Sequence, residues 1–231
     1  MNLAGYRNIV VLTGAGISQA AGLPTYRGAG GLWSDPELAR LSDVSALTRH
    51  RAKACGMFWQ FRRAIAGVEP TTAHRALAAF ERALPAAARF LIITQNVDCL
   101  HQRAGSRHVC EYHGTLLRWR CETCGVELEP PDGDVPAHCS QLMRPSAVLF
   151  GELIPPEAEY TAKQALRDCD LFVAIGTSGT VWPAASFVRW AELNGARRIL
   201  LNLEIDDEAR EAYGECHAGT ADELVARLFT A

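Results

Sequence analysis

The side chains best suited to chemistry lie in residues 94–114, TQNVDCLHQRAGSRHVCEYHG. An amide pair, Gln95 and Asn96, is followed by the carboxylate Asp98, and His113 comes near the end. Amides and carboxylates hold polar groups of a ligand, and a histidine can move a proton near neutral pH. We therefore predict that His113 is a general base and that Asn96 and Asp98 hold its substrate.

An apolar run, Phe90–Ile93, comes just before this stretch and predicts a buried parallel strand. The carboxyl ends of such strands present the ligand-binding groups of an open α/β sheet. Three further strands are predicted over residues 8–12, 171–175 and 198–201. They end in small, hydroxyl or amide residues, namely Thr13, Gly14, Ala15, Gly16, Gly176, Thr177, Ser178 and Asn202. Four such strand ends predict a single crevice suited to a phosphate or a ribose.

The first strand end has the form of a nucleotide-binding unit, in which a glycine turn joins a strand to a helix. Glycines let the backbone approach a pyrophosphate, and the helix start offers free N–H groups. The next glycine is Gly22, so the usual G-x-G-x-x-G spacing is absent and a plain turn is the alternative. More glycines surround Arg27, which suggests a lid over a ligand or else a long surface loop.

The composition is that of a globular protein with a real core, since 48% of the 231 residues are hydrophobic and 21% are charged. A net charge of -3 argues against a nucleic-acid partner, which normally requires a basic surface. No apolar run approaches the ~20 residues that span a bilayer, and no signal peptide is evident. Eight cysteines then favour free thiols or metal ligands in a reduced, cytoplasmic protein.

Helices are predicted between residues 36 and 68, where Trp59 belongs to an aromatic stripe and Arg62 lies beside it. Such a stripe usually belongs to a core, and a charge beside it needs a partner. In the next helix His74 is predicted to be a structural hydrogen-bonding residue, with Thr71 or Thr72 as the cap.

A C-x-x-C knuckle, Cys121 and Cys124, lies further along the chain, and Cys139 follows at the spacing of a structural zinc site. Four ligands are needed, but Leu142 occupies the place of the fourth cysteine. His138, Asp132 or Asp134 could replace it, or the loop could fold without metal. The spacing therefore predicts three ligands and leaves zinc open.

Taken together, these residues resemble the sirtuin family of NAD-dependent protein deacylases. The resemblance covers nearly the whole chain, in order, through GAGIS, GLPTYRG, TQNVDCLHQRAG, EYHG, the cysteine knuckle, RPSAVLFGE, GTS and LNLE. The QNVD and YHG pieces at this separation after GAGIS are highly specific.

The resemblance implies an α/β fold with a Rossmann-like, doubly wound parallel sheet and a smaller domain. The NAD-binding domain would comprise residues 1–32, 73–114 and 148–231. A helical insert (33–72) and a cysteine-knuckle insert (115–147) would form the small domain. NAD and the acyl-lysine would enter the cleft between the domains from opposite sides.

Individual roles follow by position. Asn96 and Asp98 would face the nicotinamide end of NAD, and Gln95 the adjacent ribose. Substrate peptide would pair as an added strand with the segment containing Val148, Phe150, Gly151 and Glu152. The remaining cofactor contacts would come from Gly14, Ala15, Gly16, Arg27, Gly176, Thr177, Ser178, Asn202 and Ala221.

The implied reaction begins with attack of the acyl oxygen on the ribose, which displaces nicotinamide. His113 then takes a proton from a ribose hydroxyl, and the products are a free lysine and O-acyl-ADP-ribose. The branch that removes malonyl and succinyl groups reads the acyl carboxylate with a Tyr and an Arg three apart. Arg62 matches the arginine here and Trp59 replaces the tyrosine, so acidic acyl groups are expected beside acetyl. The alternative is that the larger Trp59 ring narrows the channel towards acetyl.

Two departures from the family pattern concern the cofactor side, since Cys99 stands where glycine is usual and Tyr26 where Phe is usual. NAD hydrolysis or ADP-ribosyl transfer in the same pocket is the alternative activity. A module that senses NAD without catalysis is a third possibility, but it would not need both Asn96 and His113.

Overall fold

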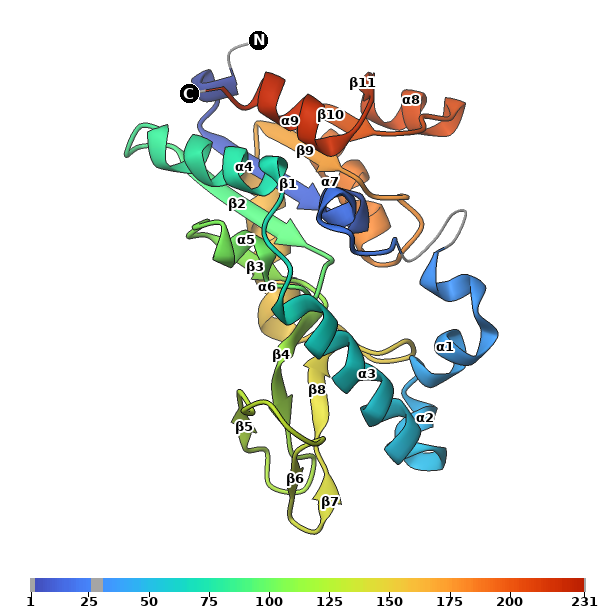
Figure 1. Cartoon of the computed structure of the whole chain (residues 1–231). Helices are drawn as coiled ribbons and strands as arrows, with labels where there is room; N and C mark the ends of the chain where they lie inside the picture. The colour runs from blue at the N-terminus through green and yellow to red at the C-terminus, as the bar shows by residue number, and fades with distance from the viewer. Residues whose placement is uncertain (1–2, 26–30, 231) are drawn as a thin grey trace.

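The computed structural model describes residues 3–25 and 31–230, and its largest feature is a six-stranded sheet in which every pairing is parallel (Figure 1). The strand order is β11-β10-β9-β1-β2-β3. The strands are β1 (Asn8–Thr13), β2 (Arg89–Thr94), β3 (Val109–Glu111), β9 (Leu171–Ile175), β10 (Arg197–Asn202) and β11 (Glu215–Ala218). Chain order reverses between β1 and β9, as in Rossmann-type sheets, and ligands bind at such a reversal. The predicted fold class is confirmed.

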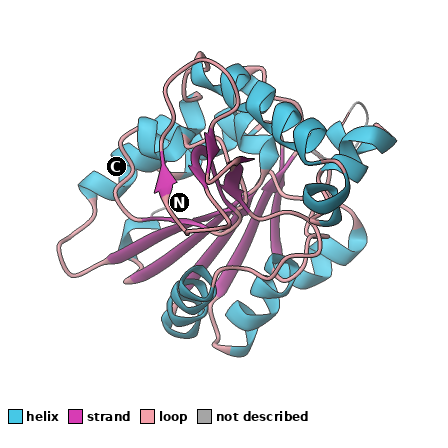
Figure 2. Ribbon diagram, turned by 90° about the horizontal axis from the view of Figure 1, so that it is seen from below, coloured by secondary structure: helices cyan, strands magenta, loops and turns pink. Residues whose placement is uncertain are grey.

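Helices cover both faces of this sheet because successive residues of its strands point to opposite sides (Figure 2). Ile9 and Val11 belong to one apolar core with helices α4 (Thr72–Ala83) and α9 (Ala221–Leu228). Val10 and Leu12 belong to a second core on the other face. That core includes α6 (Pro156–Asp168), α7 (Phe187–Leu193) and α8 (Asp207–Tyr213). No helix in residues 3–25 or 31–230 is both long and apolar enough to cross a membrane.

A smaller unit extends from the sheet and is built around a third core (Figure 1). In this core the indole rings of Trp59 and Trp119 meet edge to face, with centroids 5.1 Å apart. Its helices are α1 (Pro36–Leu41), α2 (Ser45–Arg49) and α3 (Arg51–Ala66). Its strands are β4 (Gly114–Arg120), β5 (Glu127–Leu128), β6 (Ala137–His138), β7 (Gln141–Leu142) and β8 (Arg144–Ala147). We propose that the two domains have the boundaries expected from the sequence, because β4 and β8, at the ends of the cysteine-knuckle insert, pair from Gly114↔Ala147 onwards.

Short helices connect the other elements of the described residues, and the helix predicted after the first glycine turn is one of them. The segment after the first glycine turn, η2 (Ala15–Ala21), is a 3-10 helix and not an α-helix. It ends at Gly22, whose φ of 84° lies in the left-handed region that favours glycine. The other short helices are η1 (Leu3–Gly5), η3 (Leu32–Ser34), α5 (Leu100–Arg103) and η4 (Ala184–Ser186).

Two buried histidines join α4 and α5 to β1. Thr71 caps α4 in a capping box with His74, and its backbone N–H donates to His74 Nδ1. His101 Nε2 lies 2.9 Å from the Thr13 hydroxyl, and the two imidazole rings lie 4.6 Å apart. Burial lowers the pKa of His74 to about 4 and lowers the pKa of His101 well below its ordinary value. Both histidines are structural, as predicted for His74.

We predict that the free energy of unfolding falls as pH drops from about 6.5 to about 4. The unfolded chain binds a proton on His74 near pH 6.5, whereas the folded chain resists protonation until about pH 4. This stability is therefore fully present above pH 6.5, and His74 alone removes roughly 3 kcal/mol over the window. Urea unfolding at pH 7.5 and pH 5 should show a smaller difference for His74→Gln than for wild type. His50→Gln, at an exposed site, is the control, and equal pH dependence in both variants would refute the assignment.

Candidate active site

A cavity of about 880 Å³ opens at the carboxyl ends of the sheet strands, where the small domain meets it. This volume is that of a site for a large ligand. Gln95, Asn96 and His113 line it from the sheet side, while Phe58 and Phe61 line it from α3. Most of the predicted site residues meet here, including Gly14, Ala15, Gly16, Asp98, Val148, Phe150, Gly151, Glu152, Gly176, Thr177, Ser178 and Asn202.

Three glycines bring the loops after β1 and β9 into direct backbone contact. The Gly14 N–H donates to Ile175 O over 3.0 Å, and the Gly16 N–H donates to Gly176 O over 2.9 Å. A Cβ on Gly14 would lie 2.7 Å from Gly176 O, and one on Gly176 would lie 2.7 Å from Gly16 Cα. The sequence suggested that these glycines make room for a phosphate. In the structure they first of all make room for each other.

Asn96 and Asp98 are buried and joined through Ser18. Asn96 Nδ2 donates to Gly14 O over 3.1 Å and to Ser18 Oγ over 3.2 Å. The Ser18 hydroxyl donates to Asp98 Oδ2 over 2.7 Å, and the Leu100 N–H donates to Oδ1 over 3.0 Å. Burial raises the pKa of Asp98, against the effect of these donors. The buried Asn96 Oδ1 has no partner among the described residues, so it can accept a hydrogen bond from a ligand.

His113 is held with one ring nitrogen fixed. Its Nδ1 donates to Gln95 O over 3.1 Å, which leaves Nε2 as the unprotonated, basic nitrogen. Burial lowers the pKa of His113, so the ring is neutral near pH 7 and can accept a proton. The preceding Tyr112 is fully buried against Phe187 and its hydroxyl bonds to Glu159, which fixes the backbone at His113.

Polar groups also tie the strand ends to one another. Gln95 Nε2 donates to the Thr177 hydroxyl over 3.0 Å, and Asn202 Nδ2 donates to Thr177 O over 3.2 Å. Ala221 begins α9 and packs against the first core, and it is not among the residues that line the cavity. Its cofactor contact therefore stays a prediction. Arg27 and Tyr26 lie outside the described residues.

Cys99 takes the backbone conformation that a glycine would favour. Its φ of 59° is in the left-handed region, and it stands directly before α5. Its thiol lies 3.0 Å from the Thr115 hydroxyl, and burial raises its pKa to about 12. The departure from the family pattern thus keeps the same backbone and adds an unreactive thiol.

The segment after β8 contains Phe150 and Glu152, which are predicted to pair with a peptide. The Phe150 N–H donates to Ser42 O and the Phe150 C=O accepts from the Val44 N–H, both over 2.9 Å. The Glu152 carboxylate binds Arg144 and also accepts the Leu149 N–H, because a buried guanidinium requires an anion. Both residues therefore hold the loop, and their pairing with a substrate peptide stays a prediction.

Trp59 and Arg62 are not among the residues that line the cavity. The Trp59 indole N–H donates to Gly133 O over 2.7 Å. The Arg62 guanidinium lies over the Trp59 ring, donates to Pro130 O over 2.6 Å, and lies 3.4 Å from Asp132. The cysteine-knuckle insert thus takes the hydrogen bonds of both side chains, and the expectation that this pair contacts the acyl group stays a prediction.

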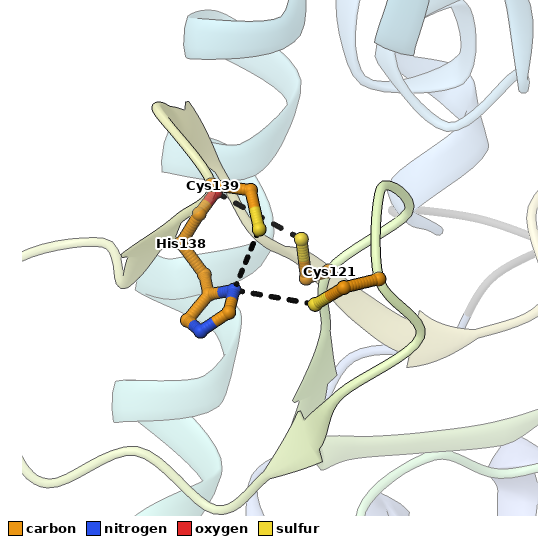
Figure 3. Close-up of side chains that lie close together, drawn as sticks. Cys121, His138 and Cys139 are labelled. Carbon is orange, nitrogen blue, oxygen red and sulfur yellow. Dashed lines mark hydrogen bonds between the residues drawn. The ribbon is translucent and has the colours of Figure 1, made fainter.

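The predicted metal ligands Cys121, Cys124 and Cys139 do come together, outside the cavity. His138 Nδ1 points to the Cys139 thiol, with Sγ 3.2 Å away (Figure 3). It also lies 3.4 Å from Cys124 Sγ. Leu142, which stands at the place expected for a fourth cysteine, is half-buried and packs against the third core.

Sequence reasoning missed Ser18 and the aromatic wall of the cavity. Ser18 belongs to the GAGIS motif, and its hydroxyl in an otherwise apolar, buried turn was the available signal. Phe58 and Phe61 belong to the same aromatic stripe as Trp59, a pattern that predicts a core. They do pack with the third core, but they also face the cavity.

This chain is similar to known proteins in sequence and in structure. Residues 14–183 match the Sir2 family model. A protein of Pasteurella multocida named NAD-dependent protein deacylase is 41% identical over 226 residues, 94% of each chain. One of the same name from Aquifex aeolicus is 40% identical over 203 residues, 85% of this chain and 84% of the relative.

The solved structures agree with these relatives. A mutant Sir2 homologue in complex with ADP-ribose has a TM-score of 0.90 at 33% identity, covering 98% of this chain and 92% of that one. A Sir2 mutant with a deacetylated peptide and 3′-O-acetyl ADP-ribose has a TM-score of 0.81 at 27% identity, covering 96% and 92%.

We predict that Gly14→Ala lowers the free energy of unfolding by about 1–3 kcal/mol, because the added methyl forces the two loops apart. The Gly14 φ of -119° suits alanine, so the effect reports space and not backbone strain. Gly56→Ala is the matched control, since nothing lies within 4 Å of the added Cβ inside α3. That variant should gain roughly 0.5–1 kcal/mol. Chemical unfolding measures both, and equal shifts would contradict the packing of the loops.

Proposed function

The chain belongs to the Sir2 family, and we propose from that membership which residues of its cavity take which role in deacylation. It is an NAD-dependent protein deacylase, and its substrates are acylated lysines of proteins or peptides. NAD supplies the ribose to which the acyl group moves, with nicotinamide as the leaving group. The observation that carries the assignment of roles is the oriented, neutral imidazole of His113 at the cavity wall.

His113 is the general base in this proposal. A base that accepts a ribose hydroxyl proton needs a free nitrogen near the substrate and an unprotonated ring at pH 7. The bond from Nδ1 to Gln95 O supports this role, because it leaves Nε2 free. Once protonated, the ring retains the same hydrogen bond, so the carbonyl also stabilises the charged form.

Asn96 and Asp98 hold the nicotinamide end of the cofactor. The unpartnered Asn96 Oδ1 is a buried acceptor, which fits the N–H donors of a carboxamide. The Ser18 hydroxyl donates a hydrogen bond to Asp98 Oδ2 and accepts one from Asn96 Nδ2, so the Asn96 and Asp98 side chains act as one rigid unit. This triple contact supports a role in positioning and not in proton transfer.

The loops after β1, β9 and β10 would hold the ribose and phosphates. Their proposed partners are Gly14, Ala15, Gly16, Gly176, Thr177, Ser178 and Asn202, with Gln95 at the ribose next to nicotinamide. The bonds of Gln95 and Asn202 to Thr177 support a preformed site, which lowers the entropy lost on binding. Arg27 and Ala221 complete the proposed cofactor contacts.

Gly151 is the proposed point of pairing for the substrate backbone. Among the hydrogen bonds of the described residues, its N–H and C=O take none, whereas both backbone groups of Phe150 are used. Gly151 also lines the cavity, together with Val148. Backbone pairing here makes little demand on peptide sequence, which suits an enzyme with many substrates.

Neutral acyl groups are the proposed preference. No lysine or arginine occurs among the described residues that line the cavity, and α3 contributes Phe58, Phe61, Ala64 and Ile65. A succinyl or malonyl carboxylate in such surroundings would lose its hydration without gaining a cationic partner. Acetyl and longer aliphatic groups would instead gain from apolar burial.

A reduced, cytoplasmic location is proposed as well. All eight cysteines are free thiols, and several of them are buried. Disulfides are rare in reducing compartments, so this state is consistent with the cytoplasm.

We predict that His113→Ala lowers the rate of deacetylation by about 10²–10⁴-fold while NAD binding survives, because only proton transfer is removed. Mass spectrometry of an acetyl-lysine peptide with NAD measures the rate, and calorimetry measures NAD binding. His108→Ala, an exposed histidine on the same domain, is the control. Near-normal turnover in His113→Ala would sink the role of His113, and NAD consumption without peptide would favour NAD hydrolysis.

We also predict that matched acetyl- and succinyl-lysine peptides are processed at rates that favour acetyl. Arg62→Met should leave the ratio of the two rates within about twofold, since Arg62 points to the insert. Its effect should instead be a lower free energy of unfolding. A selective loss of desuccinylation in Arg62→Met would restore the original expectation that Arg62 reads an acyl carboxylate.

A further inference from the structure

A second cavity, of about 280 Å³, lies beside the loop after β8. It shares Val148 and Glu152 with the larger cavity, but Arg120 and Ser146 line only this one. None of the residues proposed to bind NAD lines it. Sites for drug-sized ligands typically measure about 300–1,000 Å³, so this cavity suits a single small group. The proposed cofactor site therefore does not account for it.

Strand pairing places two guanidinium groups on the same face of β4 and β8, which lie side by side (Figure 1). Arg120 on β4 stands directly opposite Arg144 on β8, and opposite residues of an antiparallel pair share a face. Ser146 belongs to this face too, because side chains alternate along a strand. Trp119 and Ala147, on the other face, pack in the third core. Like charges directly opposite each other repel, so this face requires anions.

Only one of these two guanidinium groups has a full anionic partner. Arg144 binds both carboxylate oxygens of Glu152, over 2.5 and 2.7 Å. Arg120 Nη2 lies 3.8 Å from Glu152 Oε1, which is beyond hydrogen-bond distance. Glu122 and Arg51 complete the network. It thus contains three guanidinium groups and two carboxylates, so one positive charge has no negative partner within it.

Ser146 supplies a second unused polar group. Its Oγ is buried and has no hydrogen-bond partner among the described residues. Buried polar atoms without a partner are rare and call for an explanation, such as a ligand. Ser146 lies two residues along β8 from the position opposite Arg120, and such diagonal neighbours are about 7–8 Å apart. A small group between them can therefore reach both side chains.

The chemistry of these two side chains selects an anion. A guanidinium group binds carboxylate or phosphate oxygens through charge-assisted hydrogen bonds, and a hydroxyl can donate one more. The carboxylate of Glu152 does not oppose such a ligand strongly, because Arg144 already neutralises it. The unpaired guanidinium and the unpartnered hydroxyl thus point to the same class of ligand.

We propose that the second cavity is a subsite for a small anionic group, a carboxylate or a phosphate, bound by Arg120 and Ser146. The group comes either from an acidic residue of the substrate close to the acyl-lysine or from a free anion. The first source rests on the proposed function, since it requires the substrate backbone to pair at Gly151. Because the subsite borders the loop after β8 and not the reacting atoms, it acts on substrate affinity and not on the chemical step.

Acetyl-lysine peptides that carry Glu or Gln at single positions near the lysine test the first source. Glu at one position should raise kcat/KM about 5–10-fold through a lower KM, with kcat unchanged. Arg120→Gln should reduce this advantage to within about twofold, and Ser146→Ala should reduce it in part. Arg118→Gln is the matched control on β4, because Arg118 pairs with Glu111 and Glu127, and it should retain the advantage.

Calorimetry with inorganic phosphate tests the second source, using full-length protein saturated with NAD so that the larger cavity is filled. Phosphate should bind wild type at least about tenfold more tightly than Arg120→Gln, with sodium chloride at equal ionic strength as the control. Equal use of Glu and Gln peptides, together with equal phosphate binding in both proteins, would overturn the proposal. If no acetyl peptide is processed, the proposed function fails, whereas phosphate binding still decides the anion subsite.

Discussion

The cavity depends on the contact between two loop backbones at the reversal of strand order. Gly14, Gly16 and Gly176 pack so closely that any side chain on them would overlap the backbone of the opposite loop. The contact fixes the ends of β1 and β9 relative to each other, and the neighbouring strand ends are then tied to it through Thr177. Because Asn96 Nδ2 donates to Gly14 O, the buried unit of Asn96, Ser18 and Asp98 is attached to the same backbone.

A series of ion pairs similarly fixes the loop after β8, which carries Glu152, relative to the rest of the small domain. Arg144 is fully buried and binds Glu152, and it also lies 3.5 Å from Glu122, which pairs with Arg51. Burial alone would raise the pKa of Glu152, but its bonds to Arg144 and to the Leu149 N–H lower it. A buried ion pair adds little net stability, yet removal of one partner is costly, so such a pair fixes geometry. Since Glu122 lies between Cys121 and Cys124, the cysteine knuckle and the loop after β8 share this network.

Much of the fold and the cofactor side could be predicted from the sequence because the signals are local. Apolar runs followed by glycines or amides specify buried strands and their ends, and His113 follows such a run directly. What the sequence does not reveal concerns groups whose partners are distant in the chain. Phe150 is paired with Ser42 and Val44, and Arg62 with Pro130, across separations that no local pattern encodes. His138 was one of several candidates until the hairpin placed it beside the thiols.

Helix geometry explains why the sequence alone does not reveal which way the Arg62 side chain points. Successive residues of an α-helix are rotated by about 100°, so Phe58, Phe61 and Ile65 share a face that lines the cavity. Trp59 and Arg62 lie three apart on the adjacent face, where the carbonyls of Pro130 and Gly133 receive their donors. Both carbonyls belong to the cysteine-knuckle insert. The direction in which Arg62 points is therefore a property of the insert as much as of the helix, because the insert supplies its partners.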